Sequence, residues 1–229
     1  FGAITVASRA IYTPRLRDRL NPEAHEIHVI TSSYGKVVMQ DELPNGLQLP
    51  EGVPLHAAKS MNVPFASGSN AFDAMVILPC TMGTLGRIAH GYSEDTLLRA
   101  ADVMLKENKK LILCPRETPL SLVHVKNMEL LLQAGALLLP PNPYFYAGAK
   151  TIEELADTVV ARVLDHLGVE NTISPRWPEE QDCNRWSPVS SGLRLPPSLS
   201  FCPQSRSFRL WHERRNGLLQ LHRSKPAPL

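Results

Sequence analysis

Short, wholly apolar runs alternate with stretches of helical periodicity across the first three quarters of this 229-residue chain. The apolar runs are rich in Val, Ile and Leu and bounded by Gly, Pro or Ser, so we expect strands at residues 2–6, 26–31, 74–79, 110–115 and 136–140. Helical spacing of apolar residues occurs at 97–105, 125–132 and 152–167. Strands apolar on both faces and joined by helices predict an α/β fold, a doubly wound and mainly parallel sheet with helices on both faces.

The composition changes after Trp177. Residues 178–229 contain seven prolines and eight Lys or Arg against four Asp or Glu, and they show no sustained hydrophobic period. Such a segment buries too little apolar surface to offset the entropy lost on ordering it. We therefore expect a domain at residues 1–177 and a Pro-, Ser- and Arg-rich tail at 178–229 that is disordered or loosely packed.

Charge and cysteine content exclude several classes of protein. The formal net charge is +2 and the excess of positive charge lies in the tail, so we expect no nucleic-acid partner for the domain. No run approaches the roughly 18 consecutive apolar residues of a membrane span, and residues 1–20 lack the apolar stretch of a signal peptide. The four cysteines have no CxxC or CxxH spacing, which argues against a zinc site or a disulfide scaffold. We expect a cytoplasmic globular protein.

Residues 43–69 break the alternation. They carry four prolines and several glycines, and no strand or helix is expected within them. So long an irregular stretch inside a compact domain is usually functional or mobile. An elongated surface loop explains it equally well.

Small hydroxyl residues follow three of the predicted strands. In an open α/β sheet, ligands bind beyond the carboxyl ends of the strands, where the first N–H groups of helices point outward. Ser8 follows the first strand, Ser32 the second and Thr81 the third. Each alone is explained by helix capping. Three such residues at one edge of a sheet favour a phosphate or a phosphorylated cofactor.

Charged residues occupy two further positions of interest. Arg99 and Lys106 are seven residues apart and share one face of a predicted helix at 96–106, with Asp102 between them. Spacing alone favours an exposed ladder of charges for these three. Arg116 and Glu117 directly follow the strand at 110–115, at the edge where ligands bind, so a functional role is harder to dismiss for this pair.

Two polar residues near the end of the domain have ordinary explanations as well as functional ones. Tyr146 lies in the aromatic, proline-rich segment at 140–146 and is explained equally by packing. Arg162 lies beside the apolar face of the last predicted helix, where an ion pair near the helix end is the simpler explanation.

Taken together, these residues resemble the UbiX/Pad-type flavin prenyltransferases, a branch of the flavoprotein decarboxylase-like superfamily. The motifs that carry the resemblance, in order and with family-like spacing, are ASGSNAFDAMVILPCTMGTL (66–85), RAADVMLKE (99–107), LCPRETPLS (113–121), LPPNPYFY (139–146), TVVARVLDHLG (158–168) and PRW (175–177). The resemblance covers residues 1–177 and implies the Rossmann-like or flavodoxin-like fold of these flavoproteins.

The resemblance implies an enzyme that transfers a dimethylallyl group from dimethylallyl phosphate to N5 and C6 of reduced FMN, with no metal. Whether the donor is the monophosphate or the diphosphate is left open. The product, prenylated FMN, is expected to serve a UbiD-type decarboxylase, as in ubiquinone biosynthesis; an older label for the family, 3-polyprenyl-4-hydroxybenzoate carboxy-lyase, describes the partner's reaction. Family members form homododecamers, so a large homo-oligomer is expected, without membrane association.

Roles are carried over from the family position by position. The residues expected to bind FMN are Ala7, Ser8, Ser32, Thr81, Met82, Gly83, Thr84 and Arg116. Those expected to bind the prenyl phosphate are Lys106, Tyr146 and Arg162, with Arg99 nearby and Trp177 closing the site. Glu42 and Glu117 are expected to flank the reacting centre, so the catalytic set comprises Glu42, Lys106, Glu117, Tyr146 and Arg162. A lysine, an arginine and a phenol stabilise the departing phosphate while an allylic cation develops.

The first loop departs from the family pattern. Three glycines of the family are replaced here by Val6, Arg9 and Thr13. Glycine permits a positive φ and a close approach of the backbone to phosphate, so we expect strain at the β-branched Val6 and weaker retention of FMN. Arg9 is expected to compensate by contacting the FMN phosphate.

Two other functions stay open. One is an FMN-dependent decarboxylase of the same superfamily, acting on an aromatic acid or on a cysteine derivative, which has no need for the Lys106, Tyr146 and Arg162 set. The other is a catalytically impaired flavin-binding protein. Incubation with reduced FMN and dimethylallyl phosphate discriminates all three, because only the prenyltransferase adds the mass of a prenyl group to the flavin.

Overall fold

The computed structural model describes residues 3–6 by their backbone, and residues 11–32, 35, 37, 41, 46–60 and 63–175. The chain divides into two units, Phe1–Pro175 and Arg176–Leu229, and all described residues belong to the first. The tail at 178–229 lies outside the described residues, so its disorder and the domain boundary at residue 177 stay predictions.

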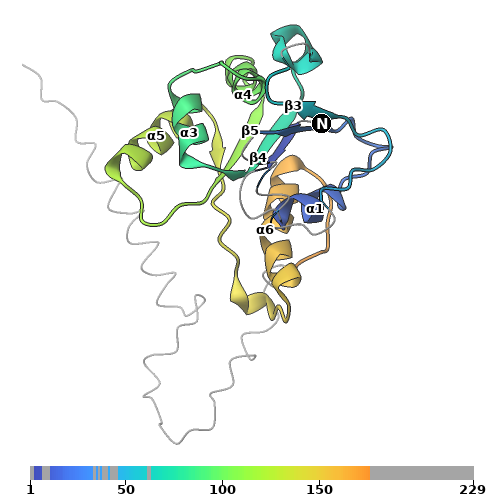
Figure 1. Cartoon of the computed structure of the whole chain (residues 1–229). Helices are drawn as coiled ribbons and strands as arrows, with labels where there is room; N and C mark the ends of the chain where they lie inside the picture. The colour runs from blue at the N-terminus through green and yellow to red at the C-terminus, as the bar shows by residue number, and fades with distance from the viewer. Residues whose placement is uncertain are drawn as a thin grey trace, which may run out of the picture. The chain divides into compact units, whose positions relative to one another are not determined.

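Six parallel strands form one sheet, visible in Figure 1. In chain order they are β1 (Ala3–Val6), β2 (His28–Thr31), β3 (Leu55–Ala57), β4 (Ala74–Cys80), β5 (Lys110–Pro115) and β6 (Leu137–Leu138). Their order in space is β3-β2-β1-β4-β5-β6. The chain therefore extends the sheet from β1 in one direction and then, starting again at β4, in the other. This arrangement confirms the doubly wound parallel sheet predicted from the sequence.

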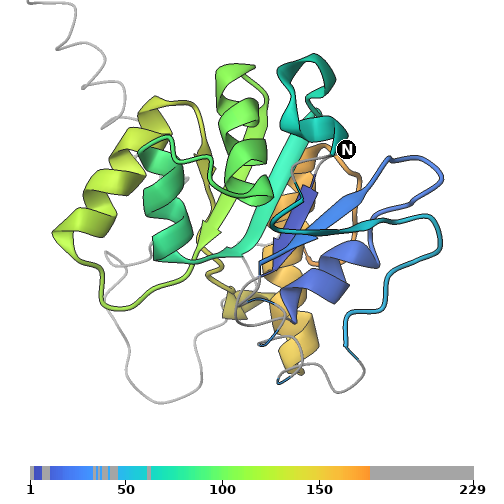
Figure 2. The same cartoon turned by 45° about the horizontal axis from the view of Figure 1, so that its top comes forward.

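Helices cover both faces of the sheet, as Figures 1 and 2 show. One face carries α3 (Met82–Ala89), α4 (Thr96–Lys106) and α5 (Leu122–Gln133). The other carries α1 (Tyr12–Arg17) and α6 (Ile152–Leu167). Side chains alternate along each strand, so Ile77 packs under α3 and α4 whereas Leu78 packs under α1 and α6. All seven residues of β4 are buried, which explains its uninterrupted apolar sequence.

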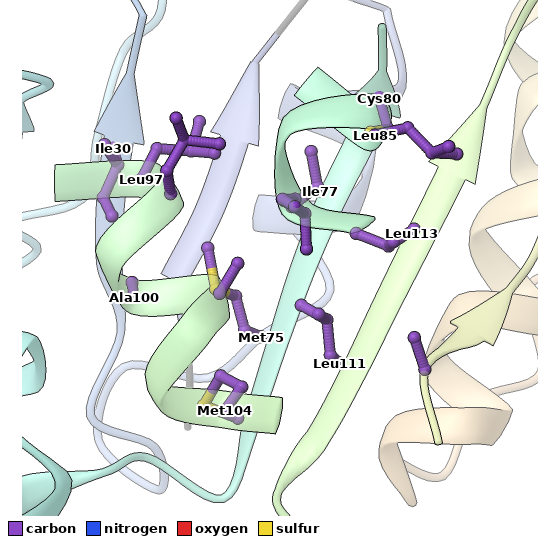
Figure 3. Close-up of a cluster of buried hydrophobic side chains, with 14 of the residues drawn as sticks. Ile30, Met75, Ile77, Cys80, Leu85, Leu97, Ala100, Met104, Leu111 and Leu113 are labelled. Carbon is purple, nitrogen blue, oxygen red and sulfur yellow. The ribbon is translucent and has the colours of Figure 1, made fainter. Parts of the chain in front are cut away.

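Helix α4 has the apolar spacing expected from the sequence. Leu97, Ala100 and Met104 face the sheet and pack over Met75 and other strand residues, as Figure 3 shows. The helix begins after Asp95, whose carboxylate accepts a hydrogen bond from the N–H of Leu98 at 2.8 Å. Each fully buried Leu or Met in this layer contributes roughly 1.5–3 kcal/mol relative to an exposed one. The core therefore fixes α4, and with it the charged residues on its outer side.

Residues 43–69 contain more structure than the sequence analysis expected. Strand β3 and two short 3₁₀ turns, η1 (Pro64–Ala66) and η2 (Gly68–Asn70), lie in this region. The strand was missed because it has only three residues, follows Pro54 and lies at the edge of the sheet, where Leu55 is half exposed. The limits of the five predicted strands agree with the observed ones to within two residues.

None of the helices in the described part of the chain has the length and apolar character needed to cross a lipid bilayer.

Candidate functional site

The sheet changes its winding direction between β1 and β4, which lie side by side. The chain leaves β1 toward the face covered by α1 and leaves β4 toward the face covered by α3. In open sheets of this kind, ligands bind beyond the carboxyl ends of the two strands at which the winding direction reverses. Residues 7–10, which follow β1, lie outside the described residues; residues 81–84, which follow β4, lie at this edge.

Thr81 caps α3 at this edge. Its hydroxyl accepts a hydrogen bond from the N–H of Thr84 at 3.2 Å and lies 3.0 Å from the Thr84 hydroxyl. The first N–H groups of a helix have no acceptor within the helix, so those of Met82 and Gly83 are oriented to receive a ligand oxygen. A Cβ added at Gly83 would have nothing nearer than the Thr81 hydroxyl at 4.0 Å, so its backbone is approachable. The geometry suits an anion or a carbonyl oxygen.

Arg116 and Glu117 lie where the sequence placed them, directly after β5. The N–H of Arg116 donates to the carbonyl of Cys80 at 3.4 Å, which fixes the start of this loop beside the start of α3. Glu117 is exposed, and its carboxylate accepts a hydrogen bond from the N–H of Thr118 at 3.1 Å. A guanidinium and a carboxylate are therefore brought to the same edge as the α3 N-terminus.

Ser32 contributes a hydroxyl from the end of β2. Its Oγ accepts a hydrogen bond from the N–H of Gly35 at 2.9 Å, the pattern of a residue that caps a following helix. Beside it, the Thr31 hydroxyl is fully buried and has no hydrogen-bond partner among the described residues. The predicted hydroxyl residues at the ends of β2 and β4 thus share one edge of the sheet.

The thiol of Cys80 lies under this edge without taking part in its chemistry. Burial raises the pKa of Cys80 to about 12, and the thiol of Cys114 on β5 is likewise buried with a raised pKa. Both thiols therefore stay protonated near neutral pH, which removes them as nucleophiles.

Arg99 and Lys106 lie on α4 and contact the segment that precedes β4. Arg99 donates from Nε to the carbonyl of Ala66 at 3.0 Å and pairs with Asp102 through Nη1 at 2.9 Å. The Lys106 ammonium pairs with Glu107 at 2.7 Å, and both side chains lie so close to Gly68 that a Cβ there would clash. Asp102 thus joins only Arg99 and not Lys106, so the predicted three-residue ladder is only half formed.

Tyr146 and Arg162 lie on the other side of the sheet from α4. Tyr146 is in the 3₁₀ turn η3 (Phe145–Ala147), is 63% exposed and stacks on Tyr144 with ring centroids 4.5 Å apart. Arg162 lies on α6 and pairs with Asp165 at 3.1 Å. The ion pair expected for Arg162 from spacing is therefore present, and its side chain is more than half exposed.

One chain does not bring the proposed phosphate-binding residues together. The chain turns from α4 into β5 beside the start of β4, since the Lys109 ammonium pairs with Asp73 and the N–H of Lys110 donates to the Asp73 carbonyl. Lys106 therefore lies at the amino edge of the sheet, whereas Thr81 lies at the carboxyl edge. The seven residues of β4 between these edges span roughly 20 Å.

Five of the residues named in the sequence analysis lie outside the described residues. They are the predicted site residues Ala7, Ser8, Glu42 and Trp177, and Arg9 of the first loop. The other two substituted positions lie in regular secondary structure. Val6 ends β1 in register with Thr31 and so has extended backbone, which means that the strain expected at Val6 is wrong. Thr13 is buried in α1 and donates from its hydroxyl to the Leu78 carbonyl at 3.4 Å, so it packs the helix against β4.

A pair of histidines escaped the sequence analysis. His28 of β2 and His56 of β3 are hydrogen-bonded through Nδ1 and Nε2 at 2.8 Å, and Phe65 and Phe72 pack against the pair. Glu26 lies 3.0 Å from the other nitrogen of His28. The spacing of Glu26 and His28 places them on one face of a strand, but their partner lies on β3, which the sequence did not predict.

Comparison with known proteins places the chain among flavoproteins. The family model described as Flavoprotein matches residues 2–164. The flavin prenyltransferase UbiX of Methanocaldococcus jannaschii is 40% identical over 176 residues, which are 76% of this chain and 95% of the relative. That of Pseudomonas aeruginosa is 40% identical over 194 residues, 78% of this chain and 93% of the relative.

Solved structures agree with this placement. The crystal structure of AnUbiX (PadA1) with FMN and dimethylallyl pyrophosphate has a TM-score of 0.70 at 35% identity and covers 78% of this chain and 96% of its own. A dodecameric FMN-dependent UbiX-like decarboxylase from Escherichia coli O157:H7 has a TM-score of 0.71 at 34% identity, with coverage of 78% and 100%. A PPC decarboxylase at 20% identity and a TM-score of 0.52 shares the fold alone.

The fold and the edge beyond β4 and β5 define a flavoprotein of the Rossmann-like class. Within that class, the chain belongs to the UbiX family of flavin prenyltransferases, which confirms the family, the fold and the enzyme class expected from the motifs. The donors at the carboxyl edge fit FMN: helix N–H groups and hydroxyls suit its phosphate or carbonyl oxygens, and Arg116 supplies a positive charge. Among the described residues, no cluster of His, Cys, Asp or Glu has the arrangement of a metal site.

Proposed function

We propose that this chain transfers a dimethylallyl group from dimethylallyl phosphate to reduced FMN and so produces prenylated FMN. The observation that carries the proposal is the 40% identity to a curated flavin prenyltransferase over 95% of that relative's length. The structure of a similar protein bound to FMN and dimethylallyl pyrophosphate supports a prenyl phosphate as the donor. FMN, when bound, supplies the nucleophilic atoms N5 and C6 to which the prenyl group is attached.

The residues at the carboxyl edge have the binding role in this proposal. The α3 N-terminus at Met82 and Gly83, with the hydroxyls of Thr81 and Thr84, supplies hydrogen-bond donors for oxygens of FMN. Arg116 adds a charge from the end of β5. The proposed FMN-binding residues also include Ser32 after β2 and Ala7 and Ser8 after β1. Together these residues hold the flavin against the carboxyl ends of the strands.

Lys106, Tyr146 and Arg162 are proposed to bind the phosphate of the donor, with Arg99 beside Lys106. As the C–O bond of the donor breaks, negative charge builds on the phosphate and positive charge on the allyl group. Two cations and a phenol hydrogen-bond the phosphate oxygens and so stabilise this separation. We propose that the flavin and apolar side chains enclose the allyl group and exclude water, which would otherwise quench the cation.

We further propose that these residues meet across copies of the chain. Lys106 and the Thr81 edge lie roughly 20 Å apart in one chain, because β4 separates them. Lys106, Tyr146 and Arg162 all have exposed side chains in the single chain, as residues completed by a neighbour would. The similar E. coli protein is described as dodecameric, which supports a homododecamer here.

Glu117 is proposed to move a proton at N5 or C6, with the departing phosphate as the second base. It directly follows Arg116 at the flavin-binding edge and is exposed there. Glu42 is proposed to flank the reacting centre and Trp177 to close the site. Both residues lie outside the described part of the chain.

A UbiD-type decarboxylase is the proposed recipient of the product, because prenylated FMN is a cofactor for other enzymes. We propose the cytoplasm as the location on the basis of the cysteine pattern. A curated yeast relative is named as mitochondrial, so fractionation of the native cell is the direct measurement.

The test is an anaerobic incubation of the purified full chain with reduced FMN and dimethylallyl phosphate, followed by mass spectrometry of the released flavin. The prenyltransferase adds one C5H8 unit to FMN. Bound but unchanged FMN would instead support a flavin-binding protein without this activity. Carbon dioxide released from an aromatic acid or a cysteine derivative, without a change in flavin mass, would support a decarboxylase.

A further inference from the structure

Tyr144 lies two residues before Tyr146 and stacks on it. The ring centroids are 4.5 Å apart and the ring planes differ by 15°. Tyr146 is 63% exposed and the intervening Phe145 is 77% exposed, so the protein core does not enclose the Tyr146 ring.

Tyr144 is itself fixed at both ends. Its N–H donates to the hydroxyl of Thr158 on α6 at 3.4 Å, and the Thr158 hydroxyl donates in turn to the carbonyl of Leu155 at 2.7 Å. Its phenol oxygen lies 2.6 Å from the hydroxyl of Ser174, and it can donate to the carbonyl of Pro175 at 3.5 Å. Thr158 and Ser174 are both buried, so these anchors belong to the rigid part of the domain.

We propose that Tyr144 is a positioning residue that holds the phenol of Tyr146 ready for the phosphate of the prenyl donor. This inference rests on the proposed function, in which Tyr146 binds that phosphate. An exposed tyrosine ordinarily samples several rotamers, and fixing one on binding costs affinity. The stack on an anchored ring removes part of that cost beforehand, because aromatic pairs restrict each other to offset or edge-to-face arrangements.

The test compares Tyr144→Ala, Tyr144→Phe and Ser174→Ala with the parent chain. Affinity for dimethylallyl phosphate is measured by calorimetry on enzyme loaded with oxidised FMN, so that no turnover occurs. We expect Tyr144→Ala to weaken binding about 3- to 10-fold. Tyr144→Phe and Ser174→Ala both remove the hydrogen bond between these two side chains, so we expect smaller losses whose sum exceeds the loss in the double variant. Tyr92→Phe, at an exposed tyrosine between α3 and α4, is the matched control and should bind as the parent does.

A double-mutant cycle separates positioning from a general structural role. In a Tyr146→Phe background the phenol is already absent, so Tyr144→Ala should then weaken binding by less than twofold. An equal loss in both backgrounds, or no loss in the parent, would overturn the inference. If Tyr144→Ala does not fold, the Tyr144→Phe and Ser174→Ala pair decides the same question. Failure of the parent to bind dimethylallyl phosphate or to prenylate FMN refutes the proposed function instead.

Discussion

The imidazole of His28 lies 2.8 Å from that of His56, Nδ1 to Nε2, with the ring planes within 5° of each other. One ring must donate and the other accept, so this contact requires at least one neutral ring. Burial and the neighbouring His28 lower the pKa of His56 below its usual value of 6.5. The contact joins β2 to the edge strand β3, and it is therefore a pH-sensitive support for the segment that leads to η1 and η2.

We expect the stability of the domain to fall as the pH falls below 6.5. The unfolded chain takes up the His56 proton at its ordinary pKa, whereas the folded chain resists it until the pH reaches its lower folded pKa. Stability from this group is fully present above pH 6.5 and is lost through the window down to the folded pKa. Thermal unfolding from pH 7.5 to 5.5 measures the effect.

His56→Phe should flatten this pH dependence, since it keeps a ring against Phe65 but has no proton to bind. His90→Asn, at an exposed histidine that ends α3, is the control and should leave the profile unchanged. A parent and a His56→Phe variant with parallel profiles would show that the histidine pair does not set the pH response.

Two threonine caps allow the flavin role of α3 to be separated from its stability. Thr81→Ala and Thr151→Ala each remove a hydroxyl that accepts from a helix N–H, at 3.2 Å in α3 and 3.1 Å in α6. Each change should cost about 1 kcal/mol of unfolding free energy. Only Thr81→Ala should also weaken FMN binding, because Thr81 directly follows β4 next to Arg116, whereas Thr151 begins a helix on the opposite face of the sheet.

Titration of each variant with FMN, followed by flavin fluorescence, measures the two FMN affinities to be compared. Thr81→Ser keeps the capping oxygen and is expected to restore both stability and FMN affinity. Equal FMN affinity in the Thr81→Ala and Thr151→Ala variants would move the flavin site away from the α3 N-terminus.

The Glu117→Gln variant should bind FMN normally and fail to turn over. The change keeps the size of the side chain and a hydrogen-bond acceptor for the Thr118 N–H, so the loop is expected to stay in place. It removes the proton-transferring carboxylate, whose loss typically costs 10²- to 10⁴-fold in rate, an order-of-magnitude expectation. Anaerobic single-turnover mass spectrometry measures it. Glu94→Gln, which breaks an exposed pair with Arg87, is the control. Normal product formation by Glu117→Gln would remove the proposed role.

The sequence predicted the fold well where burial dictates the pattern. β4 and β5 are buried on both faces, and their short, wholly apolar runs predict this kind of strand directly. Helix α4 carries an acidic cap at Asp95 and apolar residues at helical spacing, and its limits agree with the expected 96–106. Edge strand β3 was not predicted, because its pairing with β2, rather than the local propensity of its three residues, makes it a strand.

The site was predictable only in part. Thr81 and Arg116 follow strands directly, so strand prediction alone places them at the ligand edge. The position of Lys106 at the opposite edge follows from the length of α4 and from where β5 begins, which motif matching does not reveal. The stack of Tyr144 on Tyr146 was also missed, because it depends on hydrogen bonds to Thr158 and Ser174, which lie far along the chain.

Mixing two inactive variants tests whether the phosphate site is completed between copies. Lys106→Ala and Tyr146→Phe should each lower the rate of prenylation about 10²-fold or more, because each removes a donor to the leaving phosphate. If the two residues of one site come from different chains, a mixed oligomer formed by co-expression contains sites in which both are intact. Random 1:1 assembly then restores about a quarter of the parent activity. If both residues of a site come from the same chain, every site carries one defect and co-expression restores nothing. The control is a double variant carrying both changes, co-expressed with the parent. Intact sites form in this mixture under either arrangement, so its activity shows how much activity a mixed oligomer can have.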